Sequence, residues 1–345
     1  MTRILKGAKA LVLGSAKGMQ GFRMIRESRW RSEQLLILAY HGISIDDEHE
    51  WDGAYSMSQG LFRQRMEALR QGSYSVLPLG EAIERLYAGD LPPRAVTLTF
   101  DDGLHDFRVR ACPVLAEFGY PATVYLTTYF VIHRYPVFNM FFPYLLWKGR
   151  GKSVDLTGIV PGLGRDSLVT PEERLAVSNL IREYRKNEAP GNDKLQEIAR
   201  NIAKAVGQDY ERLCGLGILH LMTPPEVSEL ARYGVSVQLH THRHRVPFDQ
   251  ELFAREIRDN RNYISSMGVP NETLIHFCYP SGEYRPEFFD WLKDEGMRSA
   301  ATCETKLASS KSLPFALPRL IDTSNLTPLE FEGWLTGISQ FLPRR

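Results

Sequence analysis

The chain has 345 residues, of which 43% are hydrophobic and 24% are charged, an ordinary balance for a globular protein with one large or two smaller domains. Its formal net charge of +1 gives no electrostatic reason to expect a nucleic-acid partner. No run of residues approaches the roughly 18 consecutive apolar positions that a membrane span requires.

The first 31 residues are far more basic than the rest of the chain, because they hold eight Lys and Arg residues against Glu27 alone. Their apolar run 10–13 is too short for a secretory signal, whose core needs roughly seven to fifteen residues. We therefore expect residues 1–31 to form a basic, mostly solvated arm of a cytoplasmic protein, able to make peripheral contact with an anionic membrane. Four scattered cysteines fit reduced thiols in that compartment. They are Cys112, Cys214, Cys278 and Cys303.

Beyond this arm, short apolar runs alternate with helical stretches. The runs are too continuously apolar for a half-exposed antiparallel sheet, so they predict parallel strands in βα repeats. Thr223 and Thr327 each precede a proline and stand three residues before a glutamate, which predicts capped helix starts. The expected strands are 35–40, 74–77, 95–100, 122–126, 235–239, 275–279, 299–302 and 315–317.

Seven to eight such units favour an α/β fold of the distorted or partly open (β/α) barrel type, although an open doubly wound sheet fits the same pattern. Residues 129–222 interrupt the rhythm with an aromatic cluster and a charged helical stretch (171–206), and they are too many for a simple loop. Because they follow a strand, we expect a mainly helical insertion on the active-site face, either a lid or a unit with its own core. Residues 32–128 and 223–345 would supply the two parts of the barrel.

Residues that suit a metal site follow two of the expected strands. Asp101 and Asp102 come directly after the run 95–100, and the segment 240–244, with three histidines, comes directly after 235–239. The C-terminal ends of parallel strands lie on one face, so these groups can converge there. Two imidazoles and one carboxylate would leave a zinc-type ion an open position for water, and the second carboxylate would be free to accept a proton.

Only two of the three histidines are needed. His240 and His244 are four residues apart and lie on one side of a helical turn, whereas His242 lies on the other side, so the outer two are the better pair. Histidine triplets in loops are often surface features, and an Asp pair is often a turn or helix cap. The combination of the two segments, rather than either alone, supports a metal site.

Taken together, Thr99-Phe-Asp-Asp-Gly103 and His240-Thr-His-Arg-His244 resemble the first two motifs of the polysaccharide deacetylase family, the NodB-homology carbohydrate esterases. The resemblance covers roughly 35–128 and 223–325. Weaker likenesses to the family lie at 39–43, 277–282 and 317–320.

This resemblance implies a metal-dependent hydrolase that removes N-acetyl groups from an acetylated amino-sugar glycan, whether a polysaccharide, an oligosaccharide or a lipid-linked precursor. Asp102, His240 and His244 would bind the metal, usually zinc, and Asp101 would be the general base. The backbone N–H of Tyr279 would help to stabilise the oxyanion that forms from the acetyl group.

Two departures from the family pattern concern the proton steps. Cys278 stands where the third motif usually has an arginine that orients the base, and Arg319 is a substitute suggested by position alone, as an orienting or substrate-binding residue. The histidine that usually serves as general acid has no match late in the chain. His41 and His105 are the histidines available on the expected face, or Asp101 could perform both proton steps.

Two other functions stay open at this point. The same barrel could hydrolyse O-acetyl esters or cyclic amides. Alternatively, the missing motif arginine and acid histidine would fit a catalytically weak carbohydrate-binding protein that retains the metal for structure.

Overall fold

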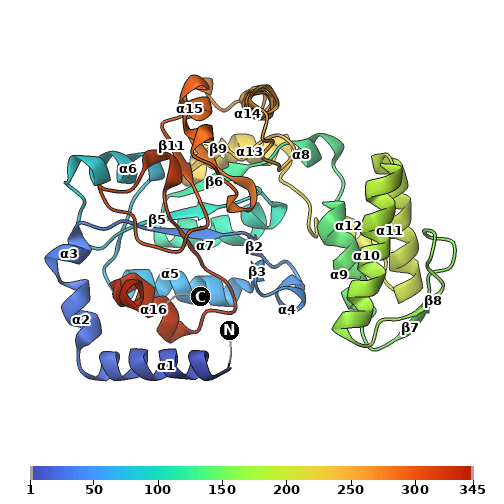
Figure 1. The fold of residues 1–345 in the computed structure, drawn as a ribbon, viewed down its shortest axis with the longest axis horizontal. Helices are drawn as coiled ribbons and strands as arrows, with labels where there is room; N and C mark the ends of the chain where they lie inside the picture. The colour runs from blue at the N-terminus through green and yellow to red at the C-terminus, as the bar shows by residue number, and fades with distance from the viewer. Residues whose placement is uncertain (1–2, 343–345) are drawn as a thin grey trace.

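The computed structural model describes residues 3–342, with side chains from residue 11 onward. Its centre is an all-parallel sheet of eight strands that curls into an incomplete barrel (Figure 1). The strand order is β11-β10-β9-β6-β5-β1-β12, and β4 pairs with the start of β5. The strands are β1 (Leu36–Tyr40), β4 (Ser75–Val76), β5 (Ala95–Phe100), β6 (Ala122–Leu126), β9 (Val235–Leu239), β10 (His276–Cys278), β11 (Ser299–Ala301) and β12 (Leu320–Ile321).

The strands have continuous apolar sequences because both of their faces are buried. Every residue of β1, β5 and β6 is buried, because helices cover the outside of the sheet and side chains fill its inside. No ladder joins the two ends of the sheet within the described residues; β11 meets the far end only through a single bridge between Ala301 and Leu317. The expected partly open (β/α) barrel is therefore confirmed.

The prediction of a last strand at 315–317 is wrong. Residues Pro314–Ala316 form a 3-10 turn, and the eighth strand is β12, a few residues further on. Pro314 and Pro318 flank the predicted run and have no backbone N–H to donate to a neighbouring strand, so the segment cannot continue a ladder.

Helices follow most of the strands and pack around the sheet (Figure 1). Capping boxes at Thr223 and Thr327 start two of them, as predicted. A short parallel pair, β2 (Gly42–Ile43) and β3 (Ser56–Met57), lies beyond the end of β1. The helices around the barrel are α4 (Glu48–Trp51), α5 (Gln59–Gln71), α6 (Leu79–Ala88), α7 (Cys112–Phe118), α8 (Tyr129–His133), α13 (Pro224–Glu229), α14 (Gln250–Ser266), α15 (Glu287–Asp294) and α16 (Pro328–Thr336).

The segment that interrupts the βα rhythm forms a helical unit beside the barrel, seen on the right of Figure 1. Phe141 and Leu145 of its first helix are buried against Ile198 and Ile202 in a hydrophobic cluster separate from that of the barrel. The charged stretch predicted as helical is two helices, because Pro190 and Gly191 separate them. The elements are α9 (Phe138–Lys148), β7 (Ser153–Asp155), β8 (Arg165–Ser167), α10 (Pro171–Glu188), α11 (Asn192–Val206) and α12 (Tyr210–Gly215).

The basic N-terminal arm is helical and packs on the barrel. Its helices are α1 (Arg3–Gly18), α2 (Gly21–Arg26) and α3 (Arg29–Ser32), and α1 lies along α16 (Figure 1). Arg31 is completely buried and donates to the carbonyl oxygen of Leu335, so one cation of the arm anchors it rather than facing solvent. Arg3, Lys6 and Lys9 have side chains outside the described residues. Among residues 3–342, no helix combines the length and the apolar character needed to cross a bilayer.

Candidate active site

The two motifs meet because their strands are near neighbours. Asp101 and Asp102 follow β5, His240 follows β9, and only β6 lies between those strands in the sheet. The Oδ1 atom of Asp102 lies 3.3 Å from Nε2 of His240 and 3.2 Å from Nε2 of His244. The structure therefore brings together the three side chains predicted to bind a metal.

The backbone turns sharply at the carboxylates. Asp102 has a φ of 69° and Gly103 a φ of 81°, both in the left-handed region that favours glycine. A Cβ atom at Gly103 would lie only 2.2 Å from Cδ1 of Leu126. The positive φ and this close approach together favour glycine at position 103.

The donor set fits a divalent ion. His240 Nδ1 lies 2.8 Å from the carbonyl oxygen of Cys278, which can only accept, so Nδ1 carries a hydrogen and Nε2 is the atom that faces Asp102. Oδ1 of Asp102 is buried without a hydrogen-bond partner. In a tetrahedral zinc site with bonds of about 2.0–2.1 Å, two ligand atoms are about 3.3–3.4 Å apart, close to the separations found here. A buried carboxylate oxygen that has no hydrogen-bond partner and faces two imidazole nitrogens suits a cation site.

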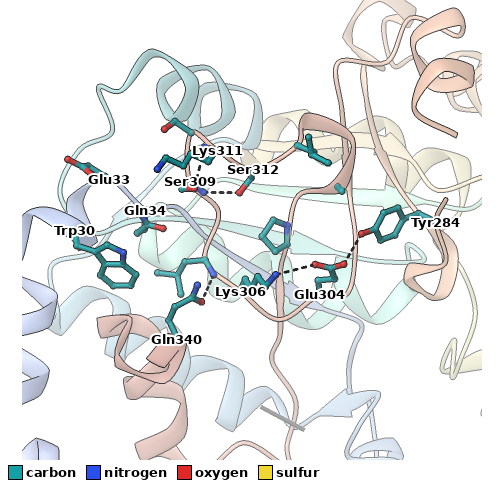
Figure 2. Close-up of a pocket in the computed structure, with 15 residues that line it drawn as sticks. Trp30, Glu33, Gln34, Tyr284, Glu304, Lys306, Ser309, Lys311, Ser312 and Gln340 are labelled. Atoms are coloured by element: carbon teal, nitrogen blue, oxygen red, sulfur yellow. Dashed lines mark hydrogen bonds and ion pairs between the residues drawn. The ribbon is translucent and has the colours of Figure 1, made fainter. Parts of the chain in front are cut away.

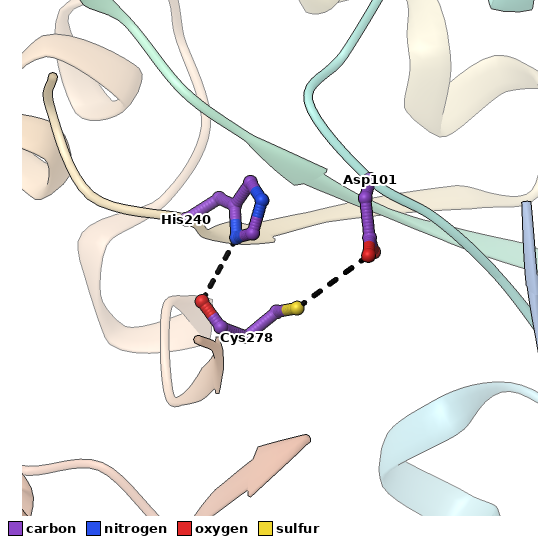
Figure 3. Close-up of side chains that lie close together, drawn as sticks. All are labelled: Asp101, His240 and Cys278. Atoms are coloured by element: carbon purple, nitrogen blue, oxygen red, sulfur yellow. Dashed lines mark hydrogen bonds between the residues drawn. The ribbon is translucent and has the colours of Figure 1, made fainter. Parts of the chain in front are cut away.

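A second group of metal-capable side chains overlaps the first and consists of Asp101, His240 and Cys278 (Figure 3). The guanidinium of Arg319 contacts two of them, with Nη2 2.7 Å from Oδ2 of Asp101 and 3.0 Å from Sγ of Cys278. Burial also raises the pKa of the Cys278 thiol well above its ordinary value. A protonated thiol beside a permanent cation is a poor metal ligand, so the set around Asp102 is favoured.

Asp101 is held apart from that set by Arg319. Two hydrogen bonds of 2.7 Å join the guanidinium to the two carboxylate oxygens, and Arg319 also donates to the carbonyl oxygen of Thr302 at 2.9 Å. Burial is the largest single effect and would raise the pKa of Asp101, but the charge and hydrogen bonds of Arg319, with smaller contributions from His41 and His240, together hold that pKa below its ordinary value. Arg319 has no exposed surface, so its contact here is with Asp101 rather than with a substrate.

Tyr279 differs from its expected role. Its backbone N–H donates to the carbonyl oxygen of Ala301 at 3.1 Å, and its hydroxyl donates to the carbonyl oxygen of Phe315 at 3.0 Å. The N–H is used because Tyr279 continues the pairing between β10 and β11. With its side chain buried as well, Tyr279 offers neither a free oxyanion donor nor a substrate contact in this structure.

The other histidines are divided between two places. His41 lies at the site, with Nε2 3.8 Å from Oδ2 of Asp101 and its side chain 22% exposed, whereas His105 pairs with Glu226 at 2.7 Å. His242 turns away from the ligand pair, as predicted, and its Nδ1 lies 2.8 Å from the hydroxyl of Thr128. His41 is thus the histidine best placed for a proton step with Asp101.

Three residues that support the site were missed by sequence reasoning. The hydroxyl of Tyr55 donates to Oδ2 of Asp102 at 2.5 Å, and no motif marks it. Asn260 accepts the backbone N–H of His240 at 3.0 Å, and Glu256 accepts that of Arg243 at 2.8 Å. Both belong to the buried face of α14, four residues apart, so two polar residues on an otherwise apolar helix face were the available signal.

Comparisons with known proteins place this fold in a family. A sequence model of the family described as polysaccharide deacetylase matches residues 88–149 and 191–300. The chain belongs to the polysaccharide deacetylase family.

Particular relatives can be named. The chain is 22% identical over 324 residues to the poly-β-1,6-N-acetyl-D-glucosamine N-deacetylase of Escherichia coli K12, an alignment that covers 93% of this chain and 41% of that protein. The chain thus spans about two fifths of the length of the curated relatives it matches.

Solved structures share the fold. The deacetylase PplD of Streptococcus pyogenes, in complex with acetate, is 18% identical with a TM-score of 0.57, and the match covers 90% of this chain and 99% of that one. IcaB from Ammonifex degensii is 18% identical with a TM-score of 0.54, covering 89% and 98%.

Proposed function

We propose that the chain is a metal-dependent hydrolase that removes N-acetyl groups from an acetylated amino-sugar glycan. The observation that carries the proposal is the division of labour between two adjacent aspartates. Asp102 converges with His240 and His244, while both carboxylate oxygens of Asp101 accept hydrogen bonds from Arg319.

A zinc-type ion held by Asp102, His240 and His244 would lower the pKa of a water molecule and polarise the acetyl carbonyl. Side chains of the protein would accept and donate the protons in the reaction. Asp101 would accept the proton of the attacking water, because Arg319 keeps its carboxylate ionised and fixed in orientation. His41, partly exposed and beside Asp101, would be the donor to the leaving amine. Acetate and the free amine of the sugar would be the products.

The substrate follows from the family and from one relative. The Escherichia coli protein is named for its action on poly-β-1,6-N-acetyl-D-glucosamine. Family membership supports an amino-sugar polymer as the substrate class, and an acetylated glucosamine unit within it is our proposal for the reacting sugar.

The test joins metal analysis to acetate release. The purified chain should contain one divalent ion, most often zinc, and should release acetate from N-acetylated glucosamine oligomers. Asp101→Asn should lose that activity by at least about 10²-fold, the lower range for a general base, with metal still bound. Undiminished release by this variant would remove Asp101 as the base. Faster hydrolysis of O-acetyl esters than of N-acetyl amides would favour the ester-hydrolase alternative.

A further inference from the structure

A groove of about 460 Å³ lies between α8 and the helical insertion, and its charge is unbalanced. Arg182, Arg185 and Lys186, from the C-terminal part of α10, line it together with Tyr129 and Asn139, and no Asp or Glu does. The arginines donate only to neutral amides: Arg185 to Oδ1 of Asn139 at 2.7 Å, and Arg182 to Oδ1 of Asn179 at 3.2 Å. Within the described residues, none of the three cations forms an ion pair.

Two other grooves have equal numbers of basic and acidic side chains. The larger pocket in Figure 2 holds two lysines and two glutamates, and Glu304 is joined to Lys306 and Tyr284. A third groove, along α5 and α7, pairs Arg63 with Glu117 and Arg70 with Glu67. An exposed cation is normally a solvated surface group, but three together in one groove without a carboxylate create a local positive potential.

The groove adjoins the metal-binding loop. Tyr129 forms part of its wall, and the backbone N–H of Tyr129 donates to the carbonyl oxygen of His242 at 2.8 Å. The two rings also pack edge to face, with centroids 5.8 Å apart. His242 stands between His240 and His244 in the chain, so a residue of the groove wall contacts the loop that carries two of the proposed metal ligands.

We propose that the groove binds the phosphate or diphosphate group of a phosphorylated glycan substrate. Arginine presents planar donors that match phosphate oxygens, and lysine adds a point charge, so two arginines and one lysine suit a group with about two negative charges. The inference rests on the proposed deacetylase function and specifies its substrate. The phosphate could belong to a lipid-linked diphosphate glycan or to a glycan that carries phosphate itself.

The test compares acetate release from matched N-acetylated oligosaccharides: unphosphorylated, carrying a terminal phosphate, and linked through diphosphate to a polyprenol in detergent micelles. At low salt we expect a kcat/KM for phosphorylated substrates at least about tenfold above that for the neutral one, the ratio that 1.4 kcal/mol produces. The difference should lie in KM and should shrink as ionic strength rises. A preference restricted to the polyprenol form identifies the lipid-linked source, and one shared by both forms identifies phosphate itself.

Two triple variants distinguish an effect of the groove from a general effect of removing positive charge. The preference ratio is kcat/KM for the phosphorylated substrate divided by kcat/KM for the neutral one. The triple variant Arg182→Gln, Arg185→Gln and Lys186→Gln should bring this ratio close to one. The matched control Lys152→Gln with Arg165→Gln and Lys204→Gln removes three exposed cations of the same insertion outside the groove and should keep the ratio. Equal rates on neutral and phosphorylated substrates, or an unchanged ratio in the groove variant, would overturn the inference alone. Absence of acetate release from every substrate would overturn the proposed function as well.

Discussion

The guanidinium of Arg319 donates two hydrogen bonds of 2.7 Å to the carboxylate of Asp101, and both side chains are almost completely buried. Arg319 directly precedes β12, whereas the family's arginine would stand at Cys278, at the end of β10. The proposed base therefore has a cationic partner that lies next to a different strand from the one the family pattern would use. The smaller Cys278 side chain lies 3.0 Å from Nη2 of Arg319, where it leaves room for the guanidinium.

Removing Arg319 should impair catalysis more than metal binding. Arg319→Met leaves the carboxylate of Asp101 buried without its partner, which costs about 3–5 kcal/mol when a buried pair is broken. We expect acetate release to fall by at least about 100-fold while zinc content, measured by mass spectrometry, stays at wild-type level.

A double variant tests whether the lost activity comes from the missing arginine rather than from misfolding. Cys278→Arg combined with Arg319→Ala returns an arginine to the family's usual position, and it should recover part of the activity that Arg319→Ala alone loses. Wild-type activity in Arg319→Met would show that Asp101 needs no orienting cation.

Tyr55 should tune metal affinity without touching the metal. Its hydroxyl donates to Oδ2 of Asp102 and leaves Oδ1 to face the histidines. Loss of a hydrogen bond that orients a metal ligand typically weakens metal binding by about 10–100-fold. Tyr55→Phe should show this in a competition titration with a zinc chelator. Tyr284→Phe, which removes a hydrogen bond to Glu304 away from the site, is the control and should retain wild-type affinity.

Much of the fold could be predicted because its signals are local. Strands buried on both faces give continuous apolar runs, and capping residues such as Thr223 and Thr327 mark helix starts within a few positions. The motif residues after β5 and β9 could be placed together because parallel strands end on one face. The same reasoning wrongly predicted a strand at 315–317. The composition of this segment is apolar like that of a strand, and only the flanking prolines argue against one.

The supporting contacts of the site could not be predicted in this way. Tyr55 reaches Asp102 across 47 positions of sequence, and Arg319 reaches Asp101 across 218, so no local period records either contact. For Arg319 the position in the chain gave a correct suggestion, but only the structure shows the two hydrogen bonds. For Tyr279 the expected role as an oxyanion donor is not supported, because its backbone N–H already donates to the carbonyl oxygen of Ala301 in the sheet.

The ligand assignment predicts which histidines matter for metal content. His240→Ala and His244→Ala should each lower bound zinc to well under one ion per chain, because each removes one of three protein ligands. His242→Asn, with a side chain that can still reach the hydroxyl of Thr128, should keep the ion. Elemental analysis after dialysis decides between the variants. Full zinc content in His244→Ala would point instead to the group of Asp101, His240 and Cys278.

The N-terminal helices lead to a prediction about membranes. Leu11, Met19 and Met24 are each more than 70% exposed, and they lie among cations such as Arg23. We propose that this N-terminal segment contacts anionic lipid, because exposed apolar side chains beside basic residues suit a membrane interface. The chain should co-sediment with phosphatidylserine vesicles more than with neutral ones. Leu11→Gln with Met19→Gln and Met24→Gln should reduce that binding, and equal binding to both kinds of vesicle would contradict the proposal.

His276 should make the fold sensitive to mild acid. Its side chain is buried beneath the sheet end with Nδ1 2.8 Å from the hydroxyl of Ser299, and burial, with a smaller effect of Arg298, lowers its pKa to about 4. The unfolded chain, with a histidine pKa near 6.5, binds more protons than the folded chain between these values. Stability from this residue is therefore complete above about pH 6.5 and is lost as the pH falls towards 4, by about 3 kcal/mol in all.

The variant His276→Asn keeps a polar group near Ser299 but cannot titrate in this range. Its free energy of unfolding, measured by denaturant titration from pH 4 to pH 7, should depend less on pH than that of the wild type. Because every other titrating group is common to both proteins, the difference between the two curves isolates His276. That difference should change by about 3 kcal/mol between pH 6.5 and pH 4, the linkage value for a shift of this size. A difference that stays constant with pH would mean that His276 is protonated as readily in the folded chain as in the unfolded one.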